Sequence, residues 1–221
     1  MRLIEEAQER PRVSGVQLDA LLAQGWRHFG TTFYRYNFAL LQGQLHAIIP
    51  LRLELGGFVP SRSQRRVIRK NADTRTVFRM AAITPAKEEM FARHAERFAE
   101  NRPKSLYDFV SPQPQSVPCT CMNIDVFLGE RLIATSFLDT GKAAVSSNYA
   151  IYDPGFAGRS LGIYTAIEEI RLAQEHGKKF YYLGYGTHGP SLYDYKKQIG
   201  NMQGYDWRGA WLPLAAWSLE S

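Results

Sequence analysis

Hydrophobic residues recur at helical spacing in three segments of this chain, residues 14–25, 84–98 and 159–176. The first begins with a Ser-x-x-Gln capping box at Ser14. The second begins with Thr84-Pro85, in which threonine is the N-cap and proline takes the first helical position. Residues that commonly end helices follow each segment. The pattern therefore predicts three helices.

Runs of aliphatic and aromatic residues predict strands between and around these helices. Gln42-Gly43 and Gly129-Glu130 supply turns between neighbouring strands, whereas four prolines make residues 103–118 a loop. Strands on both sides of a central helix predict a mixed α/β sheet. The expected strands are 33–39, 45–55, 77–80, 122–128, 131–138, 143–152, 180–183 and 210–212.

The composition fits a protein with a sizeable core. Of the 221 residues, 45% are hydrophobic and 22% are charged, which suffices for one large domain or two small lobes. No run of about 18 apolar residues occurs, and the N-terminus lacks the apolar core of a signal peptide. We therefore expect a cytoplasmic protein without a membrane partner.

Cysteine and histidine are sparse. The two cysteines, Cys119 and Cys121, cannot build a disulfide framework, and a zinc site made of cysteine alone needs about four. Their spacing places both on one face of a strand, where we interpret them as ordinary half-buried residues. The five histidines show no metal-ligand spacing. The sequence therefore predicts no metal.

Positive charge is concentrated between Ser61 and Arg79. This segment has seven basic residues against the single Asp73, so it carries a charge equal to the net charge of the whole chain, +6. Clustered cations bind polyanions by releasing counterions from phosphates. The segment is either such a binding surface or a solvated basic strand or loop, and charge alone does not distinguish the two.

Arg159-Ser160-Leu161-Gly162 lies between a predicted strand and a predicted helix. Free N–H groups and the helix dipole at such a start can hold a phosphate or an oxyanion, and Gly162 permits close approach. The alternative is an ordinary helix cap. Acetyl-CoA-dependent N-acyltransferases use a similar turn with a small last residue. Tyr164 stands at that position here, which disfavours coenzyme A.

Several motifs on both sides of this turn occur together, and with them the chain resembles the arginyl- and leucyl-tRNA–protein transferases. The resemblance spans roughly residues 18–200. Its N-terminal motifs are Gly25-Trp26-Arg27-His28-Phe29-Gly30, Tyr34-Arg35, Pro50-Leu51-Arg52, and Pro60-Ser61-Arg62-Ser63-Gln64-Arg65-Arg66 with Asn71 and Asp73. Its C-terminal motifs are Ser146-Ser147, Asp153-Pro154, Arg159-Ser160-Leu161-Gly162 with Tyr164, Tyr181-Tyr182-Leu183-Gly184-Tyr185 and Tyr195-Lys196.

The resemblance implies an N-acetyltransferase-related α/β domain over residues 84–221, preceded by a smaller α+β lobe over 1–83. It implies transfer of an amino acid, leucine rather than arginine, from aminoacyl-tRNA to proteins that begin with Asp or Glu, marking them for degradation. Aminoacyl-tRNA is then the co-substrate, and no diffusible cofactor is needed. No nucleophile with a paired base is evident, so direct aminolysis of the ester is expected.

The resemblance also suggests roles for particular residues. Arg159, Ser160 and Gly162 are expected to hold the tRNA 3′ end or the oxyanion, unless they only cap the helix. Asp153 and Tyr149 complete the catalytic candidates, Asp153 as a group that orients the amine or accepts its proton. The candidates for binding tRNA or the acceptor are Arg62, Gln64, Arg65, Arg66, Tyr164, Tyr185, Tyr195 and Lys196. Surface or half-buried structural roles are the alternatives for these residues.

Two departures from the family pattern qualify this interpretation. Family members carry cysteines between the elements matching Tyr34 and Arg52, whereas this chain has none there. We therefore expect no iron–sulfur cluster or zinc, and apolar packing by residues such as Leu45 and Ile48 instead. Leu192-Tyr193 stands where the family tends to have Lys-Met. A different acceptor, or a non-catalytic protein that binds tRNA or N-termini, are the alternatives that these departures leave open.

Overall fold

A computed structural model of the chain describes residues 2–41, 43–98, 102–189 and 194–218. The helices are α1 (Gly15–Ala23), α2 (Arg62–Lys70), α3 (Pro85–Ala95), α4 (Leu161–Glu175) and α5 (Asp194–Lys197). The strands are β1 (Glu5–Glu9), β2 (Arg27–Phe29), β3 (Thr32–Tyr36), β4 (Phe38–Leu41), β5 (Gln44–Glu54), β6 (Arg75–Met80), β7 (Cys121–Leu128), β8 (Arg131–Thr140), β9 (Ala144–Tyr152), β10 (Phe180–Thr187), β11 (Met202–Tyr205) and β12 (Trp211–Pro213).

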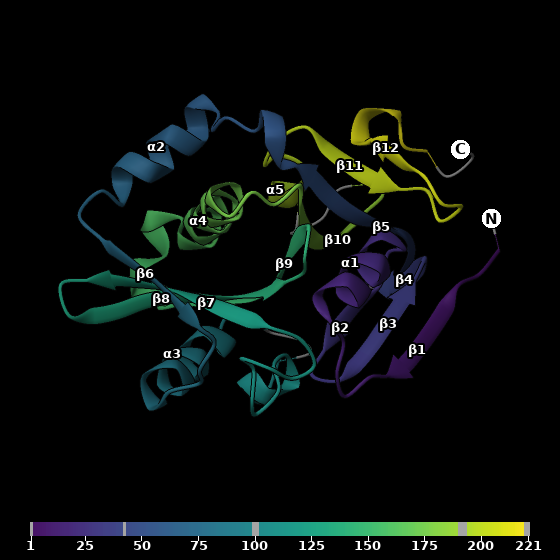
Figure 1. Ribbon diagram of the computed structural model, residues 1–221. Helices are drawn as coiled ribbons and strands as arrows, with labels where there is room; N and C mark the ends of the chain where they lie inside the picture. Colours follow the sequence, from purple (N-terminus) through teal and green to yellow (C-terminus); the bar gives the residue numbers. More distant parts are fainter. Residues whose placement is uncertain (1, 42, 99–101, 190–193, 219–221) are drawn as a thin grey trace.

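One large sheet organises the molecule (Figure 1). Within the described residues it has nine strands in the order β12-β11-β5-β10-β9-β8-β7-β6, with β4 paired to β5 off this path. Strands β6 to β9 are antiparallel neighbours, whereas β9 and β10 are parallel and are connected through α4. A separate three-stranded sheet has the order β1-β3-β2. The mixed α/β fold predicted from the sequence is confirmed.

Each face of the large sheet is covered by different helices (Figure 1). Successive residues of a strand point to opposite faces. Leu138 accordingly packs in the core beneath α4, and its neighbour Phe137 packs beneath α3. In β10, Tyr181 lies in the α4 core, whereas Tyr182 packs with α1 and the three-stranded sheet. Two layers therefore enclose β9 and β10.

The three predicted helices are present as α1, α3 and α4. Ser14 caps α1 in a capping box with Gln17, as expected. The third helix is shorter than predicted, since residues Pro154–Arg159 form a 3-10 turn and α4 begins only at Leu161. Among the strands, the prediction of one continuous strand over 33–39 is wrong. The chain breaks at Asn37, whose buried side chain accepts from Ile4 N–H and donates to the Arg2 carbonyl.

The interpretation of the whole basic segment as a strand or loop is also wrong. Residues Arg62–Lys70 form helix α2, and only Arg75–Met80 is a strand. Ser61 accepts from Gln64 N–H, and the Gln64 side chain accepts from Ser61 N–H. The Ser-x-x-Gln signal that predicted α1 therefore predicts α2 equally well. Arginine is a good helix former, so the charge did not argue against a helix.

Strands β1, β2 and β11 were not predicted, because they are short and lack an apolar run. Strands β5 and β6, which precede the predicted boundary at residue 83, pair with β10, β11 and β7 in the large sheet. The division into lobes at 83 and 84 stays a prediction. Over the described residues, every helix is too short or too polar to cross a lipid bilayer.

Candidate active site

The parallel strands β9 and β10 pair only over their first residues. The last pair is Tyr182 with Ser146, and both strands become irregular just beyond it. The register of β10 against β5 shifts between Tyr182 and Tyr185, and the register of β9 against β8 shifts next to Ser147. The sheet therefore opens between its two central strands, where the backbone N–H and C=O groups of β9 and β10 no longer pair with each other.

Two cations meet at this opening, beside Gly184. The φ angle of Gly184 is +80°, a conformation that favours glycine. A Cβ atom at this position would lie 3.4 Å from Nζ of Lys196 and 3.8 Å from Nη2 of Arg27. Arg27 is buried and donates to the Ser146 hydroxyl and the Ser147 carbonyl, which are neutral acceptors. Burial, and secondly the charge of Arg27, lower the pKa of Lys196 to about 8.

A buried carboxylate lies on the α4 side of the same opening. Glu169 accepts a 2.6 Å hydrogen bond from the Tyr181 hydroxyl and a longer one, 3.4 Å, from Ser147. Glu169 is 1% exposed, and its burial raises the pKa of this carboxyl to about 7 despite these hydrogen bonds. Ser147 is half-buried and lies between Glu169 and the opening. The carboxyl can therefore exchange a proton near neutral pH through the Ser147 hydroxyl.

Aromatic rings form a continuous row that leads to the opening. Tyr149 stacks on Phe109 with ring centroids 3.7 Å apart, and Phe109 contacts Phe29 edge-on at 5.0 Å. Phe29 contacts Tyr34, which contacts Tyr185 at 6.1 Å. Phe29 is 37% exposed and the other four rings are half-buried. Nucleobases stack on such rings, although the Tyr185 hydroxyl itself is used in a 2.7 Å bond to the Gly25 carbonyl.

The start of α4 is tied to the end of α2. Arg159 makes a two-pronged ion pair with Asp73, at 2.7 and 2.8 Å, and also donates to the Lys70 carbonyl. Ser160 has a φ of 58°, which is uncommon for a residue other than glycine, and its side chain does not cap the helix. A side chain at Gly162 would meet open space. Part of the charge that Arg159 offers a ligand is therefore offset by Asp73.

Two further candidates, Asp153 and Tyr164, make their contacts away from this opening. Asp153 is buried and accepts from Gly155 N–H and from Arg131. Burial alone would raise the pKa of Asp153, but these hydrogen bonds and the nearby arginines hold it below its usual value, which makes this carboxylate a weak base. Tyr164 packs in the core, with its hydroxyl 3.3 Å from Thr76. Its bulk therefore does not stand in the turn at the start of α4.

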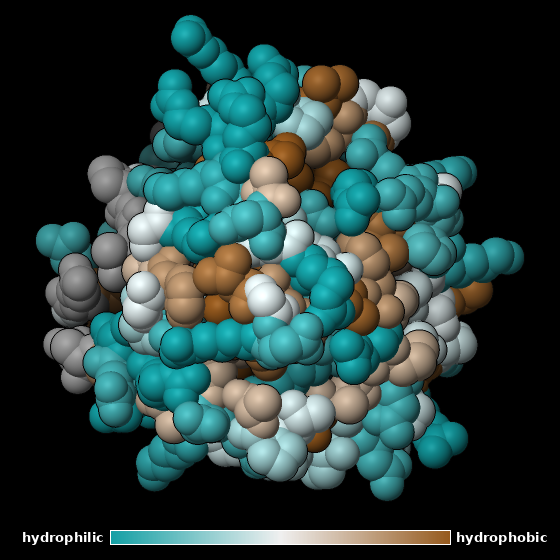
Figure 2. Space-filling model, turned by 90° about the vertical axis from the view of Figure 1, so that its left-hand side faces the viewer, coloured by the Kyte–Doolittle hydropathy of each residue, from teal (hydrophilic) through white to brown (hydrophobic). Residues whose placement is uncertain are grey.

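Helix α2 presents its arginines to solvent. Arg62, Arg65 and Arg66 are exposed, whereas Gln64 is buried and its amide donates to the Ile199 carbonyl at 2.7 Å. Figure 2 shows hydrophilic side chains over the upper part of the face on which α2 lies. Helix α2 packs on α4, so its basic surface continues toward the start of that helix. Its three exposed arginines are well placed for a polyanion, and Gln64 is placed as a structural residue.

The structure thus brings some of the predicted residues together and leaves others apart. Tyr185 and Lys196 lie at the opening between β9 and β10, and Tyr149 lies at the far end of the aromatic row. Tyr195, on the same helix as Lys196, is 40% exposed. Gly162 lies in the first turn of α4, about 10 Å along the helix from Glu169 at a rise of 1.5 Å per residue, and Arg159 and Ser160 precede the helix. Leu192 and Tyr193 lie outside the described residues.

Sequence reasoning missed Arg27, Ser147 and Glu169 as site residues. Glu169 had a usable signal, because it falls on the otherwise apolar stripe of the α4 segment with Ala166, Ile170 and Ala173. A lone carboxyl on a buried helical face requires a polar partner, and such groups often have shifted pKa values. Arg27 had no comparable signal, since its partners come from a distant strand.

The segment between Tyr34 and Arg52 does not fit a metal or cluster, because it has no cysteine. The expected apolar replacement is present only in part. Ile48 is buried against Tyr205 and Trp207, whereas Leu45 is 70% exposed. The buried Asn37 holds the N-terminal segment by hydrogen bonds instead.

Comparison with known proteins places the chain in a family. Residues 86–206, more than half of the chain, match the family described as arginine-tRNA-protein transferase, C terminus. An aspartate/glutamate leucyltransferase from Cereibacter sphaeroides is 30% identical over 201 residues, which cover 85% of this chain and 68% of the relative. This chain belongs to the arginine-tRNA-protein transferase family. It is therefore an acyltransferase, and the resemblance seen in the sequence motifs is confirmed.

Two other comparisons agree with this placement. An aspartate/glutamate leucyltransferase from Leptospira interrogans is 27% identical over 190 residues, covering 84% of this chain and 72% of the relative. The crystal structure of FemX superposes with a TM-score of 0.54 and covers 91% of this chain and 69% of FemX, at 13% identity. At that identity the similarity concerns the fold alone.

Proposed function

We propose that this transferase moves leucine from leucyl-tRNA to the N-terminal amine of proteins that begin with Asp or Glu. The observation that carries the proposal is the meeting of Arg27 and Lys196 over Gly184. The opening between β9 and β10 would admit the end of a chain. The pair of cations there fits an acidic side chain, because arginine can bind a carboxylate through two hydrogen bonds. The relatives named aspartate/glutamate leucyltransferase support the same acceptor and donor.

Glu169 then serves as the base for the incoming amine. The amine nitrogen attacks the ester carbonyl carbon of leucyl-tRNA, and its proton passes through the Ser147 hydroxyl to Glu169. The bond between the carbonyl carbon and the ribose oxygen breaks, and that oxygen takes up the proton. A base with a pKa of about 7 suits this transfer near neutral pH, whereas the paired Asp153 does not. Tyr181 positions Glu169 through its 2.6 Å hydrogen bond.

The tRNA is held by more distant groups in this proposal. Terminal bases stack along the row from Tyr149 to Tyr185, and the phosphates meet Arg159 and the first turn of α4. The exposed arginines of α2 extend this surface and add an electrostatic contribution to tRNA affinity, which decreases as the salt concentration rises. The protein would act with aminoacyl-tRNA as its co-substrate and without a diffusible cofactor.

A transfer assay tests the proposal directly. The full chain is incubated with radiolabelled leucyl-tRNA or arginyl-tRNA and with peptides that differ only in a first residue of Asp, Glu or Ala. We expect leucine on the Asp and Glu peptides only. Label on none of the peptides with either donor would refute the proposal. Equal label on all three would instead support a different acceptor.

A further inference from the structure

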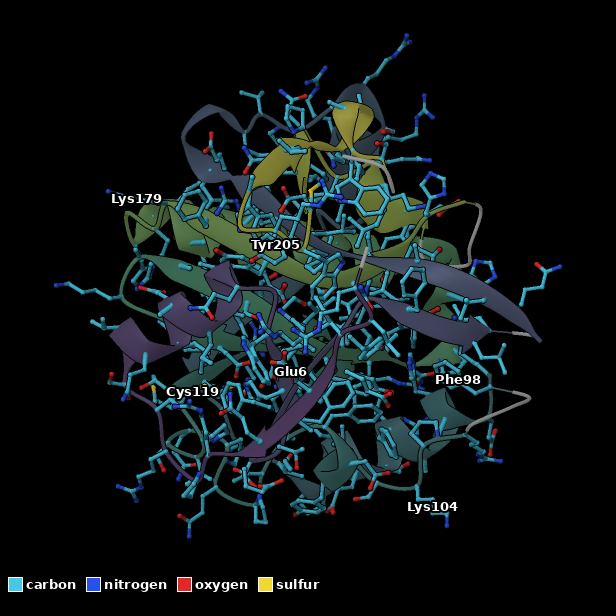
Figure 3. All side chains as sticks on the ribbon, turned by 90° about the vertical axis from the view of Figure 1, so that its right-hand side faces the viewer. Glu6, Phe98, Lys104, Cys119, Lys179 and Tyr205 are labelled. Carbon is cyan, nitrogen blue, oxygen red and sulfur yellow. The ribbon has the colours of Figure 1, made fainter. Side chains whose placement is uncertain are left out.

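Three potential metal ligands from distant parts of the chain meet where the small sheet packs against the large one. His28 lies in β2, Cys119 lies just before β7, and Asp139 lies in β8. One ligand atom from each residue lies within 4.8 Å of the other two, and all three side chains are buried. Figure 3 shows Cys119 beside α1, on the side of the molecule that carries the small sheet.

The orientation of His28 leaves one ring nitrogen as a ligand. Its Nδ1 lies 3.0 Å from the Gly30 carbonyl, which can only accept, so the proton is on Nδ1. Nε2 lies 3.0 Å from Oδ2 of Asp139 and 3.9 Å from Sγ of Cys119. With a proton on Nε2 this contact is a buried ion pair, whereas without one Nε2 and the carboxylate oxygen are two acceptors that a metal cation can bridge. Metal-binding histidines characteristically donate their other N–H to such a carbonyl.

A second thiol, that of Cys121, lies beside Asp139 but outside the group of three whose ligand atoms are within 4.8 Å of one another. Cys121 is the cross-strand partner of Asp139 and begins β7, two residues after Cys119, which precedes the strand. The Cys121 thiol donates to the Met122 carbonyl at 3.4 Å. Together with His28 and Asp139 it lines a small cavity with about 10 Å³ of free space, room for no more than one water or ion. Asp139 also accepts from Asn148 at 3.2 Å, as the carboxylate ligands of metals often do.

We propose that His28, Cys119 and Asp139, with Cys121 as the fourth ligand, form a structural zinc site. Mixed nitrogen, sulfur and oxygen donors suit tetrahedral zinc, whereas calcium and magnesium prefer oxygen alone. Zinc binds the two thiols as thiolates, so two protons leave as the metal enters. Without metal, burial raises the pKa of Cys119 and of Cys121, which keeps both thiols protonated. This proposal departs from the expectation, drawn from the sequence, that no metal is bound.

The zinc site would join β2 to the large sheet beside the opening between β9 and β10. His28 follows Arg27 directly, and Arg27 donates to Ser146 and Ser147 of β9. Cys119 belongs to the apolar cluster that packs against α1. Zinc bound there would therefore hold Arg27 at the opening. Only this consequence for Arg27 rests on the proposed function, because metal content can be measured without activity.

The first test uses the unaltered chain. The purified protein, prepared without a metal-affinity tag, is stripped with a chelator under reducing conditions and titrated with Co²⁺. We expect saturation at about one ion per chain. The expected spectrum has a thiolate-to-cobalt charge-transfer band and the strong visible bands of tetrahedral cobalt. A protein that folds but shows neither band at saturating Co²⁺ overturns the proposal and leaves His28 and Asp139 as a plain buried ion pair.

The second test measures zinc in variants. Cys119→Ser and His28→Asn are each expected to lower the zinc content of the folded protein to near zero. His94→Asn is the matched control. His94 is equally buried and also bonds to backbone, at Tyr152, but it belongs to another cluster. Zinc retained equally in all three variants would overturn the proposal, and circular dichroism confirms that each compared sample is folded. If zinc binds but no peptide is leucylated, the site stands and the proposed function fails.

Discussion

Replacing Glu169 with glutamine gives the most direct test of the proposed chemistry. Glutamine can still accept the hydrogen bond from Tyr181, so the local packing is retained, but it cannot take a proton from the amine. Loss of a general base typically costs about 10²- to 10⁴-fold in rate. We therefore expect kcat to fall by about this factor. We also expect the rising limb of the pH profile, near pH 7 in the unaltered protein, to disappear.

The same substitution changes stability in the opposite direction. The pKa of Glu169 is about 7 in the folded protein, against an ordinary value of 4.5. The folded state therefore holds a proton that the unfolded chain releases. The stability contributed by this carboxyl is present below about pH 4.5 and is lost as pH rises to about 7. The shift corresponds to about 3 kcal/mol in the free energy of unfolding. Glutamine does not titrate, so the variant does not lose this stability as pH rises. Above pH 7 its free energy of unfolding is therefore higher than that of the unaltered protein by up to about 3 kcal/mol.

The assay pairs leucyl transfer to an Asp peptide, from pH 5.5 to 9, with urea denaturation at pH 5 and pH 8. Glu168→Gln is the control, because Glu168 is the neighbouring buried glutamate of α4 and pairs with Arg171 instead of Tyr181. We expect near-normal kcat in this control. The reasoning is refuted if Glu169→Gln lowers kcat less than tenfold and keeps the rising limb near pH 7.

Three other predictions concern the acceptor, the tRNA and a helix cap. Arg27→Gln should raise KM for an Asp peptide by about 30-fold or more, since truncating one partner of a buried charge pair costs about 2–5 kcal/mol. It should leave kcat at a saturating concentration of the Asp peptide nearly unchanged, and a fall in kcat with an unchanged KM would contradict a role in recognising the acid. Changing the exposed arginines of α2 together to glutamine (Arg62, Arg65 and Arg66) should reduce the salt dependence of tRNA binding by a slope of about 2 in a fluorescence anisotropy titration. An unchanged slope would remove α2 from the tRNA surface. Ser61→Ala should lower the free energy of unfolding by about 1 kcal/mol through loss of the α2 cap. In thermal denaturation Ser63→Ala, two residues further along the chain, should lower the midpoint temperature less than Ser61→Ala does. A larger decrease for Ser63→Ala would show that the capping box contributes little to stability.

Local features of the fold were readable from the sequence because they depend on neighbouring residues. The capping box at Ser14, the Thr84-Pro85 start of α3 and the apolar period of α4 predicted three helices, although the Thr84 side chain makes no capping hydrogen bond. Turn residues separated most strands. The same type of signal at Ser61 predicts α2, although the basic residues of this segment are also compatible with a solvated strand or loop. Short strands without an apolar run, such as β2, carried no local signal at all.

What the sequence by itself determined is the family, through motifs that occur in order, together with the helices and most strands of a mixed sheet. Only the tertiary structure decided which side chains meet. Arg27 reaches Lys196 because β10 lies between β5 and β9 and bulges at Gly184. His28 reaches Cys119 and Asp139 because the small sheet packs against the large one. Strand order, bulges and sheet packing bring together residues far apart in the chain. They depend on the balance of burial over the whole molecule, which no local pattern records.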